Sequence, residues 1–372
     1  MAMWLAIFGA VLLFAIAGAA YIVCGFHRFS PIKKLGEKHR FLAWVTAAVI
    51  AAAVCGAWAI VNVWSVAIVM IHLFIIWLFC DIIAAVVHKI RGKKPERYIA
   101  GVVALVVTAA YLGAGWFFAH HIYITNYELT TDKNVGDGLR IALIADSHLG
   151  ITLDGEEFAE QTERISAVEP DIVVVAGDFV DDESKKADME RACQALGEIN
   201  STYGVYFVYG NHDKGYYSED YRDFSFEDLD SCLKENGVVV LSDESVAVGE
   251  NLCITGRRDK YEENMGEGRA TMDELFSGLD SSRYTIVLDH QPNDYAAEAA
   301  AGADLVLSGH THGGPLIPAG QIGLLMGAND RVYGHERRNS TDFIVTSGIS
   351  GWALPFKTGT VSEIVVIDVK GE

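Results

Sequence analysis

The sequence predicts two parts of different fold class, an all-α membrane region in its first third and an α/β domain in the remainder. Three observations indicate this division. Four apolar stretches, each near the roughly 20 residues that span a bilayer, occupy the first 120 residues. Short runs rich in Val, Ile and Leu then alternate with helical patterns, as in sheets covered on both faces. Each run is followed by a short polar cluster, which predicts a site at one edge of the sheet.

The predicted transmembrane domain covers residues 1–122. Its helices are expected at about 3–26, 41–61, 64–87 and 99–120. The second and third are separated only by Asn62 and Val63, so we expect a hairpin there. The first stretch lacks a basic amino-terminal region and is longer than the apolar core of a secretory signal, which favours a helix. Asp81 lies inside the third stretch, and we expect snorkelling or a hydrogen bond between helices to satisfy it.

Basic residues are concentrated in two of the loops between these helices. Five lie between the first and second helices and five between the third and fourth, namely Arg28, Lys33, Lys34, Lys38 and Arg40, then Lys89, Arg91, Lys93, Lys94 and Arg97. Basic loops stay in the cytoplasm. The sequence therefore predicts a multi-pass protein of the cell membrane, with the domain that follows residue 122 on the extracytoplasmic face.

The two parts carry opposite net charge. Residues 1–125 hold ten Lys or Arg and three acidic residues, a charge of +7, so the remainder of a chain of −20 carries −27. No basic footprint would offset repulsion by phosphates, so we expect no nucleic-acid partner. Three of the six cysteines lie in apolar helices and three later, which predicts no disulfide framework.

Residues 123–137 are expected to form a linker and residues 138–372 one α/β domain. Buried strands are predicted at 139–145, 171–176, 205–209, 284–288 and 303–307, with helical patterns at 155–169 and 182–199. In such sheets, ligands bind outside the carboxyl ends of the strands. Polar residues that follow different strands are therefore expected to converge in one crevice.

Five polar clusters follow the predicted strands. They are Asp146-Ser147-His148, Gly177-Asp178-Phe179-Val180-Asp181, Gly210-Asn211-His212-Asp213, Asp289-His290 and Gly309-His310-Thr311-His312. Carboxylates suit hard cations and imidazoles suit borderline ones, and no cysteine occurs in the five clusters. This mixture favours a hydrolytic metal pair over a structural zinc site. Taken singly, Asp146 and Asn211 would be cap or turn residues, and His290 could simply end a strand before a proline.

The ordered set resembles the calcineurin-like metallophosphoesterases, whose pattern is D-x-H, G-D-x-x-D, G-N-H-D/E, H and G-H-x-H. The resemblance covers about residues 139–369. Gly313-Gly314 and the Ser347-Gly348-Ile349 turn are similar to the membrane-anchored bacterial subgroup, which includes lipid-directed phosphoesterases and pyrophosphatases. The resemblance implies a metallophosphoesterase-type four-layer αββα sandwich, preceded here by an all-α domain of four transmembrane helices.

The resemblance also implies two divalent metal ions, drawn from Mn, Fe, Zn or Mg, as cofactors. It assigns one metal to Asp146, His148, Asp178 and His312, and the other to Asp178, Asn211, His290 and His310. Asp178 would bridge the two ions, and a hydroxide between them would be the nucleophile. His212 would be the catalytic histidine that is not a ligand, and Asp181 would orient it. Asp213 would either support its loop or be a solvated surface residue.

Other residues bear on substrate contacts. Asp182 stands where protein phosphatases of this superfamily carry arginine, and Lys357 stands where an arginine is common. Arg257 and Arg258 are candidate substrate contacts, with exposed surface arginines as the alternative interpretation.

We expect a membrane-anchored enzyme that hydrolyses phosphodiester, pyrophosphate or phosphomonoester bonds, with a phosphate-ester substrate that could be lipid-linked. Two alternatives stay open: a membrane sensor or binding platform without turnover, and a lipid-precursor pyrophosphatase on the cytoplasmic face. The substrate, the native metals and the oligomeric state are left open by the sequence.

Overall fold

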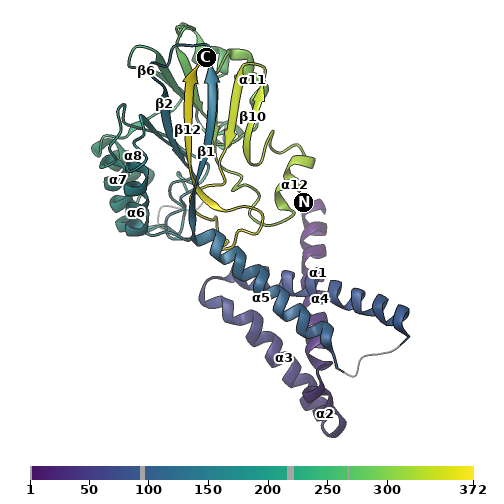
Figure 1. Ribbon diagram of the computed structural model, residues 1–372. Helices are drawn as coiled ribbons and strands as arrows, with labels where there is room; N and C mark the ends of the chain where they lie inside the picture. Colours follow the sequence, from purple (N-terminus) through teal and green to yellow (C-terminus); the bar gives the residue numbers. More distant parts are fainter. Residues whose placement is uncertain (1, 93–96, 216–221, 267) are drawn as a thin grey trace. The chain divides into compact units, whose positions relative to one another are not determined.

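The computed structural model describes residues 2–92, 97–215, 222–266 and 268–372 (Figure 1). The chain divides into two compact units, Met1–Ala114 and Gly115–Glu372. Lys93 and Lys94, which belong to the second predicted basic loop, lie outside the described residues.

The first unit is helical. Its elements are α1 Ala2–His27, α2 Ser30–Lys38, α3 Arg40–Gly56, the 3₁₀ turn η1 Ala57–Ile60, α4 Val63–Arg91 and most of α5 Ile99–His120. Among the described residues, Arg40–Ile60, Val63–Arg91 and Ile99–His120 are long and apolar enough to cross a membrane. Leu13–His27 and Ser30–Lys38 form a pair bent by 83°, which gives a fourth span if the pair counts as one. Three of the four predicted spans thus have a single helix of sufficient length and apolarity, and the first span stays a prediction.

Small residues allow the helices of the first unit to approach closely. Ala43, Ala47, Ala51 and Cys55 recur every four residues on α3 and are buried. On α1, a side chain at Gly25 would lie 2.6 Å from the ring of Trp77, which is itself fully buried. In a bilayer the hydrophobic effect does not drive helices together, so helices associate largely through close packing at small residues.

Asp81, the acidic residue in α4, is held by contacts from α1 and from residues that directly follow α1 or precede α5. Tyr21 of α1 donates to its Oδ2 at 2.6 Å, and Tyr98 donates to its Oδ1 at 2.6 Å. Arg28 forms an ion pair with the same carboxylate at 2.5 Å, and Trp77 Nε1 donates to the Tyr98 hydroxyl at 2.8 Å. These contacts confirm the expected hydrogen bonding between helices and explain Asp81 without a transport function.

Replacing Asp81 by Ala is expected to lower the free energy of unfolding of the helical unit by about 1–3 kcal/mol, because three partners lose their acceptor. The measurement is thermal unfolding of the full-length protein in detergent, followed by tryptophan fluorescence, since the helical unit contains Trp4, Trp44, Trp58, Trp64 and Trp77. The control is Glu37→Ala, which removes an exposed carboxylate from the same unit. Equal melting temperatures for the two variants would contradict a structural role for Asp81.

The second unit contains two sheets, each with six strands among the described residues. The strands are β1 Ile122–Thr131, β2 Leu139–Ile144, β3 Ile172–Ala176, β4 Val205–Val208, β5 Val239–Val240, β6 Glu244–Val248, β7 Leu252–Gly256, β8 Tyr284–Leu288, β9 Leu305–Ser308, β10 Gly334–Arg338, β11 Thr341–Val345 and β12 Ser362–Gly371. The first sheet has the order β1-β12-β2-β3-β4-β5 and the second β10-β11-β9-β8-β7-β6. Strands β2 to β5 run parallel, as do β7, β8, β9 and β11.

Alternate residues of the central strands contribute to different cores. In β2, Ile141 and Leu143 join a cluster that includes residues of both sheets, such as Ile254 and Ile286. Ala142 and Ile144 join a second cluster that includes residues of helices. Because both faces of the strand are buried over residues 141–144, these residues are all apolar and do not alternate with polar ones.

Seven helices complete the second unit as described. They are α6 Gly155–Ser166, α7 Lys186–Gly197, α8 Phe226–Glu235, α9 Lys260–Met265, α10 Met272–Phe276, α11 Tyr295–Ala301 and α12 Ala319–Leu325. Figure 1 shows α6, α7 and α8 together beside the first sheet, and Phe158, Leu196 and Leu229 from these helices lie in one cluster with its strands. A smaller cluster joins α10 and α11 to the second sheet through Met272, Tyr295 and Phe343.

The expected linker at residues 123–137 is mostly a strand. Residues Ile122–Thr131 form β1, which pairs in parallel with β12 along its whole length at the edge of the first sheet. Only one side of an edge strand is paired, and from Tyr123 to Thr131 exposed side chains alternate with buried or half-buried ones. Its mixture of Ile, Thr, Asn and Glu is therefore less apolar than the runs that predicted the central strands.

Candidate metal centre

All five predicted polar clusters lie in loops that follow the carboxyl ends of parallel strands. Asp146 and His148 follow β2, Asp178 follows β3, and Asn211 follows β4 in the first sheet; His290 and then His310 and His312 follow β8 and β9 in the second. The two sheets meet at these loops through hydrogen bonds. The backbone N–H of His310 donates to Asp146 Oδ1 at 2.9 Å, and His290 Nδ1 lies 2.7 Å from the carbonyl oxygen of Ala176.

The loops make sharp turns at the predicted ligands. Asp146, His148, Asp178, His310 and His312 all have positive φ, between 37° and 70°. This left-handed conformation is uncommon for residues other than glycine, and such strain concentrates at functional sites. The turns bring the side chains back over the strand ends.

The structure brings Asp146, His148 and His312 together. Candidate ligand atoms of the three residues lie within 4.8 Å of one another. The rings of His148 and His312 stack with centroids 5.1 Å apart, and all three residues are buried. Three of the four residues predicted to hold the first metal thus form one group.

A second group consists of Asp178, His290 and His310, again with candidate ligand atoms within 4.8 Å. Asp178 Oδ2 lies 3.1 Å from His290 Nε2 and 3.6 Å from His148 Nε2, so this carboxylate faces both groups. Its other oxygen, Oδ1, accepts a hydrogen bond from the backbone of His212 at 2.8 Å. Asn211, the remaining predicted ligand, is buried in the same loop as His212.

The donor atoms fit a pair of divalent cations. Asp146 Oδ2 and His148 Nε2 are buried and have no hydrogen-bond partner among the described residues. His290 Nε2 is also buried, and it faces Asp178 Oδ2 at 3.1 Å. The opposite ring nitrogens are engaged: Nδ1 of His148 by Asp181, Nδ1 of His290 by Ala176 and Nδ1 of His312 by the carbonyl of Ser350. Metal-binding histidines use one ring nitrogen for the metal and the other for such a partner. Buried polar atoms without partners otherwise carry a desolvation penalty.

The site concentrates ionisable groups away from water. Burial raises the pKa of Asp178, but His290, His212 and His148 outweigh it and hold that pKa well below its usual value. Burial lowers the pKa of His290, yet the Asp178 carboxylate raises it well above the usual range. Burial, together with repulsion by His290, lowers the pKa of His310 to about 4. Burial also raises the pKa of Asp146 to about 6.

Asp181 lies between a predicted ligand and the predicted catalytic histidine. Its Oδ2 is 2.9 Å from His148 Nδ1, and its Oδ1 is 3.4 Å from His212 Nδ1. Burial raises the pKa of Asp181, but the two histidines outweigh it and hold that pKa far below its usual value. For His212, burial lowers the pKa and the carboxylates of Asp181 and Asp178 raise it above the usual value. The third group of possible ligand atoms in the structure is this set, His148, Asp181 and His212.

Asp213 holds together the loops that follow β3 and β4. Its carboxylate accepts hydrogen bonds from the backbone N–H groups of Asp178, Phe179, Val180 and Gly210, at 2.7 to 3.0 Å. It is fully buried, so the expectation that it supports the loop is correct and the surface interpretation is wrong. Its place at the end of the Gly210-Asn211-His212-Asp213 cluster is the signal that marks it in the sequence.

Two charged residues differ from the sequence-based expectations. Arg257 is buried and forms ion pairs with Asp289 and Asp294, so it is not an exposed arginine. Lys357 is also buried, and its Nζ donates to the carbonyls of Ser347 and Gly348 at 2.6 and 3.1 Å. Lys357 is therefore a structural residue of the turn beside Asp146 and not an open phosphate contact.

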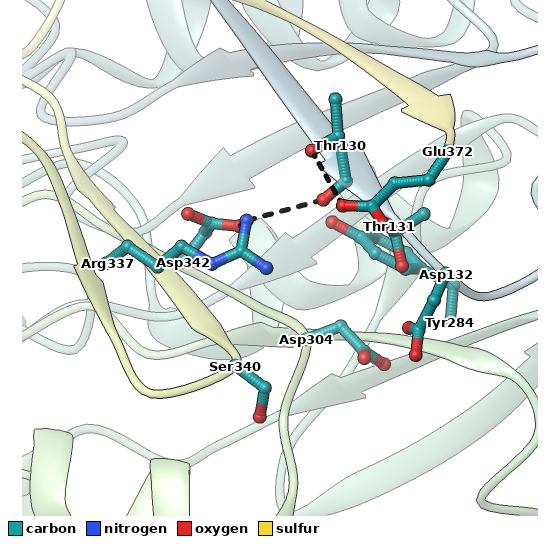
Figure 2. Close-up of a pocket in the computed structure, with 9 residues that line it drawn as sticks. All are labelled: Thr130, Thr131, Asp132, Tyr284, Asp304, Arg337, Ser340, Asp342 and Glu372. Atoms are coloured by element: carbon teal, nitrogen blue, oxygen red, sulfur yellow. Dashed lines mark hydrogen bonds and ion pairs between the residues drawn. The ribbon is translucent and has the colours of Figure 1, made fainter.

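A separate polar pocket of about 190 Å³ lies at the other edge of the sheets (Figure 2). It includes Tyr284, Asp304 and Asp342, which stand near the amino-terminal ends of β8, β9 and β11. Asp304 is paired with Lys133, and Asp342 with Arg337 and His335. These ion pairs account for the carboxylates of Asp304 and Asp342, and the pocket shares no residue with the metal centre.

The fold and the two ligand groups define a domain of the metallophosphoesterase class. The family model described as calcineurin-like phosphoesterase matches residues 139–314. An uncharacterized metallophosphoesterase of Aquifex aeolicus is 32% identical over 258 residues, which cover 68% of this chain and 94% of the relative. The chain therefore belongs to the calcineurin-like phosphoesterase family.

Two further relatives extend the comparison. An uncharacterized metallophosphoesterase of Campylobacter jejuni is 30% identical over 240 residues, 64% of this chain and 61% of the relative. A "Transmembrane protein with metallophosphoesterase domain" of Danio rerio is 29% identical over 300 residues, 75% of this chain and 66% of the relative. The match to the Campylobacter protein thus spans only about three fifths of that protein's length.

Close packing at Gly210 gives a test of the ligand geometry. A Cβ atom at this position would lie 2.5 Å from the backbone nitrogen of Asp178 and would also contact the Asp178 carboxylate. The backbone cannot yield as a flexible side chain does, so Gly210→Ala is expected to displace Asp178 and weaken Mn²⁺ binding by about 10–100-fold, the range seen when the partners of ligands are disturbed.

The measurement is Mn²⁺ titration calorimetry of the full-length protein in detergent. Gly371→Ala is the matched control, because a Cβ there would meet nothing within 4 Å. Unchanged affinity in Gly210→Ala protein would show that Asp178 does not hold the metal.

Proposed function

We propose that this chain is a membrane-anchored, metal-dependent phosphoesterase that hydrolyses phosphodiester, pyrophosphate or phosphomonoester bonds. The observation that carries the proposal is the position of Asp178. Its Oδ2 atom lies 3.6 Å from His148 Nε2 in one group of ligand atoms and 3.1 Å from His290 Nε2 in the other. Membership of the calcineurin-like phosphoesterase family supports the same activity.

The proposed ligand set is the one predicted from the sequence. Asp146, His148 and His312 would hold one cation, Asn211, His290 and His310 the other, and Asp178 would contact both. Two divalent cations at such a centre polarise a phosphoryl group and lower the pKa of a water molecule enough to make it a nucleophile at neutral pH.

His212 is proposed to protonate the leaving oxygen or to stabilise the charge that develops on the phosphoryl group. The raised pKa of its imidazole, which Asp181 and Asp178 cause against the effect of burial, favours the protonated form that such a role requires. Trp352, half exposed, has its ring centroid 5.4 Å from that of His212. This indole would limit the access of water to the proton donor.

The finer architecture is part of the proposal. We propose four layers in the order helices, first sheet, second sheet, helices. Three apolar clusters support this order: one between helices and the first sheet, one between the two sheets, and one between the second sheet and helices. The predicted domain boundary near residue 122 falls close to the division at Gly115. Four spans, with the catalytic domain on the extracytoplasmic face, are supported by the basic residues after α1 and at the end of α4.

Turnover by the full-length protein tests the activity. Protein purified in detergent is stripped with a chelator, supplied with Mn²⁺ and given bis(p-nitrophenyl) phosphate or p-nitrophenyl phosphate. We expect metal-dependent hydrolysis that Asp178→Asn reduces to the uncatalysed rate, because both cations lose a shared ligand. Asp273→Asn, at an exposed position of α10, is expected to change nothing.

Full turnover by the Asp178→Asn variant would refute the proposed centre. Binding of two Mn²⁺ ions without hydrolysis of either ester would instead favour the binding-platform alternative.

Paired reporters test the membrane face. Alkaline phosphatase fused after Glu372 is expected to be active and green fluorescent protein at the same position to be dark, because the domain is proposed to lie outside the cytoplasm. Fusions at Gly36, in the first basic loop, should give the opposite pair of results. A fluorescent protein that is bright after Glu372 would place the domain inside and favour the cytoplasmic-face alternative.

A further inference from the structure

The second unit exposes an apolar segment immediately after the metal centre. Residues 313–329, which follow the predicted ligand His312, contain no charged residue, although the part of the chain after residue 125 carries −27. Within this segment, Ile317 is 55% exposed, Leu325 87% and Met326 79%, and Ile322 and Leu324 are also exposed. Large apolar side chains this exposed, in one continuous segment, mark an interaction surface.

The ends of the apolar segment are fixed to the site loops. A Cβ at Gly314 would lie 2.7 Å from the Cα of Gly320, so the start of α12 packs directly on the turn after His312. At the other end, the hydroxyl of Thr311 donates to the carbonyl of Val332 at 2.5 Å. The surface therefore stands at a set position beside the ligands.

Residues 356–358 contact both the apolar segment and the end of the apolar helix α5. The carbonyl of Gly115 in α5 accepts from the backbone of Lys357 at 2.9 Å, and Trp116 packs edge-on against Phe356. The next residue, Thr358, contacts the apolar segment. Its backbone N–H donates to the carbonyl of Pro315 at 2.7 Å, and its hydroxyl accepts from the backbone N–H of Ile317 at 3.3 Å.

The end of α5 has the residues expected at a bilayer surface. The helix Ile99–His120 is apolar and long enough to cross a membrane. Its last turns contain Trp116 and His120, and His121 and Tyr123 follow it. Tryptophan and tyrosine collect where lipid headgroups meet water. The contacts through Phe356, Lys357 and Thr358 therefore place Ile317 near the carboxyl-terminal end of α5.

We propose that residues 315–326 contact the lipid bilayer and hold the metal centre at the level of the lipid headgroups. The inference goes beyond the proposed activity and rests on the proposed membrane anchoring through α5. The occupant is a bilayer because an uncharged apolar segment on an acidic domain, tied to the end of a membrane helix, can approach a lipid surface without bringing charge into it. A phosphoester at the surface of that bilayer would then reach the ligands without leaving the membrane.

Photo-crosslinking in vesicles tests the contact directly. Full-length protein is reconstituted in phosphatidylcholine and phosphatidylglycerol vesicles, with benzoylphenylalanine introduced at one of three positions. They are Leu325 in the apolar segment, Phe117 in α5 and Val239 in β5, the strand of the first sheet farthest from β1. All three side chains are exposed, so the substitution leaves the core intact.

After irradiation, mass spectrometry is expected to show a shift of one phospholipid on the chains labelled at Leu325 and Phe117, and no shift at Val239. Lipid on Phe117 but not on Leu325, or a crosslink from Leu325 to another part of the protein, would overturn this inference and leave the proposed anchoring intact. No lipid on either would overturn both. None of these outcomes depends on turnover, so the test is independent of the proposed catalytic activity.

Discussion

Two hydrogen bonds between the sheets determine the geometry of the metal centre. One joins His290 of the second sheet to the last carbonyl of β3, and the other joins the backbone of His310 to Asp146 at the end of β2. Both use residues that are also predicted ligands. The packing of the sheets therefore also fixes the ligands, because each group of donor atoms draws on both sheets and a shift of either sheet would pull its members apart.

This arrangement has a conformational and electrostatic cost. Five predicted ligands adopt positive φ, and carboxylates and imidazoles are crowded where water is excluded. The structure offsets part of that cost with backbone donors, since Asp213 alone accepts four N–H groups from the loops after β3 and β4. Asp146 Oδ2 and His148 Nε2 have no hydrogen-bond partner among the described residues, and a bound cation would compensate them.

Much of this could be predicted from the sequence, because burial on both faces makes the central strands continuous apolar runs. The strand predicted at 284–288 is β8 as observed, and that predicted at 139–145 is one residue longer than β2. Convergence of the clusters followed from the rule for parallel strands. Strand β1 was missed because an edge strand has a mixed composition. The burial of Arg257 and Lys357 could not be foreseen, since it depends on partners such as Asp294 and the Ser347 carbonyl that only the fold brings near.

The position of Asp181 changes the role that the family resemblance suggested for it. The resemblance made it the residue that orients His212, but the shorter contact is to Nδ1 of His148, at 2.9 Å against 3.4 Å. A carboxylate on Nδ1 fixes the tautomer of an imidazole and leaves Nε2 free for a cation. One side chain therefore supports both a predicted ligand and the predicted proton donor. Its loss would disturb the binding of metal as well as the transfer of a proton, so the two functions cannot be separated at this residue.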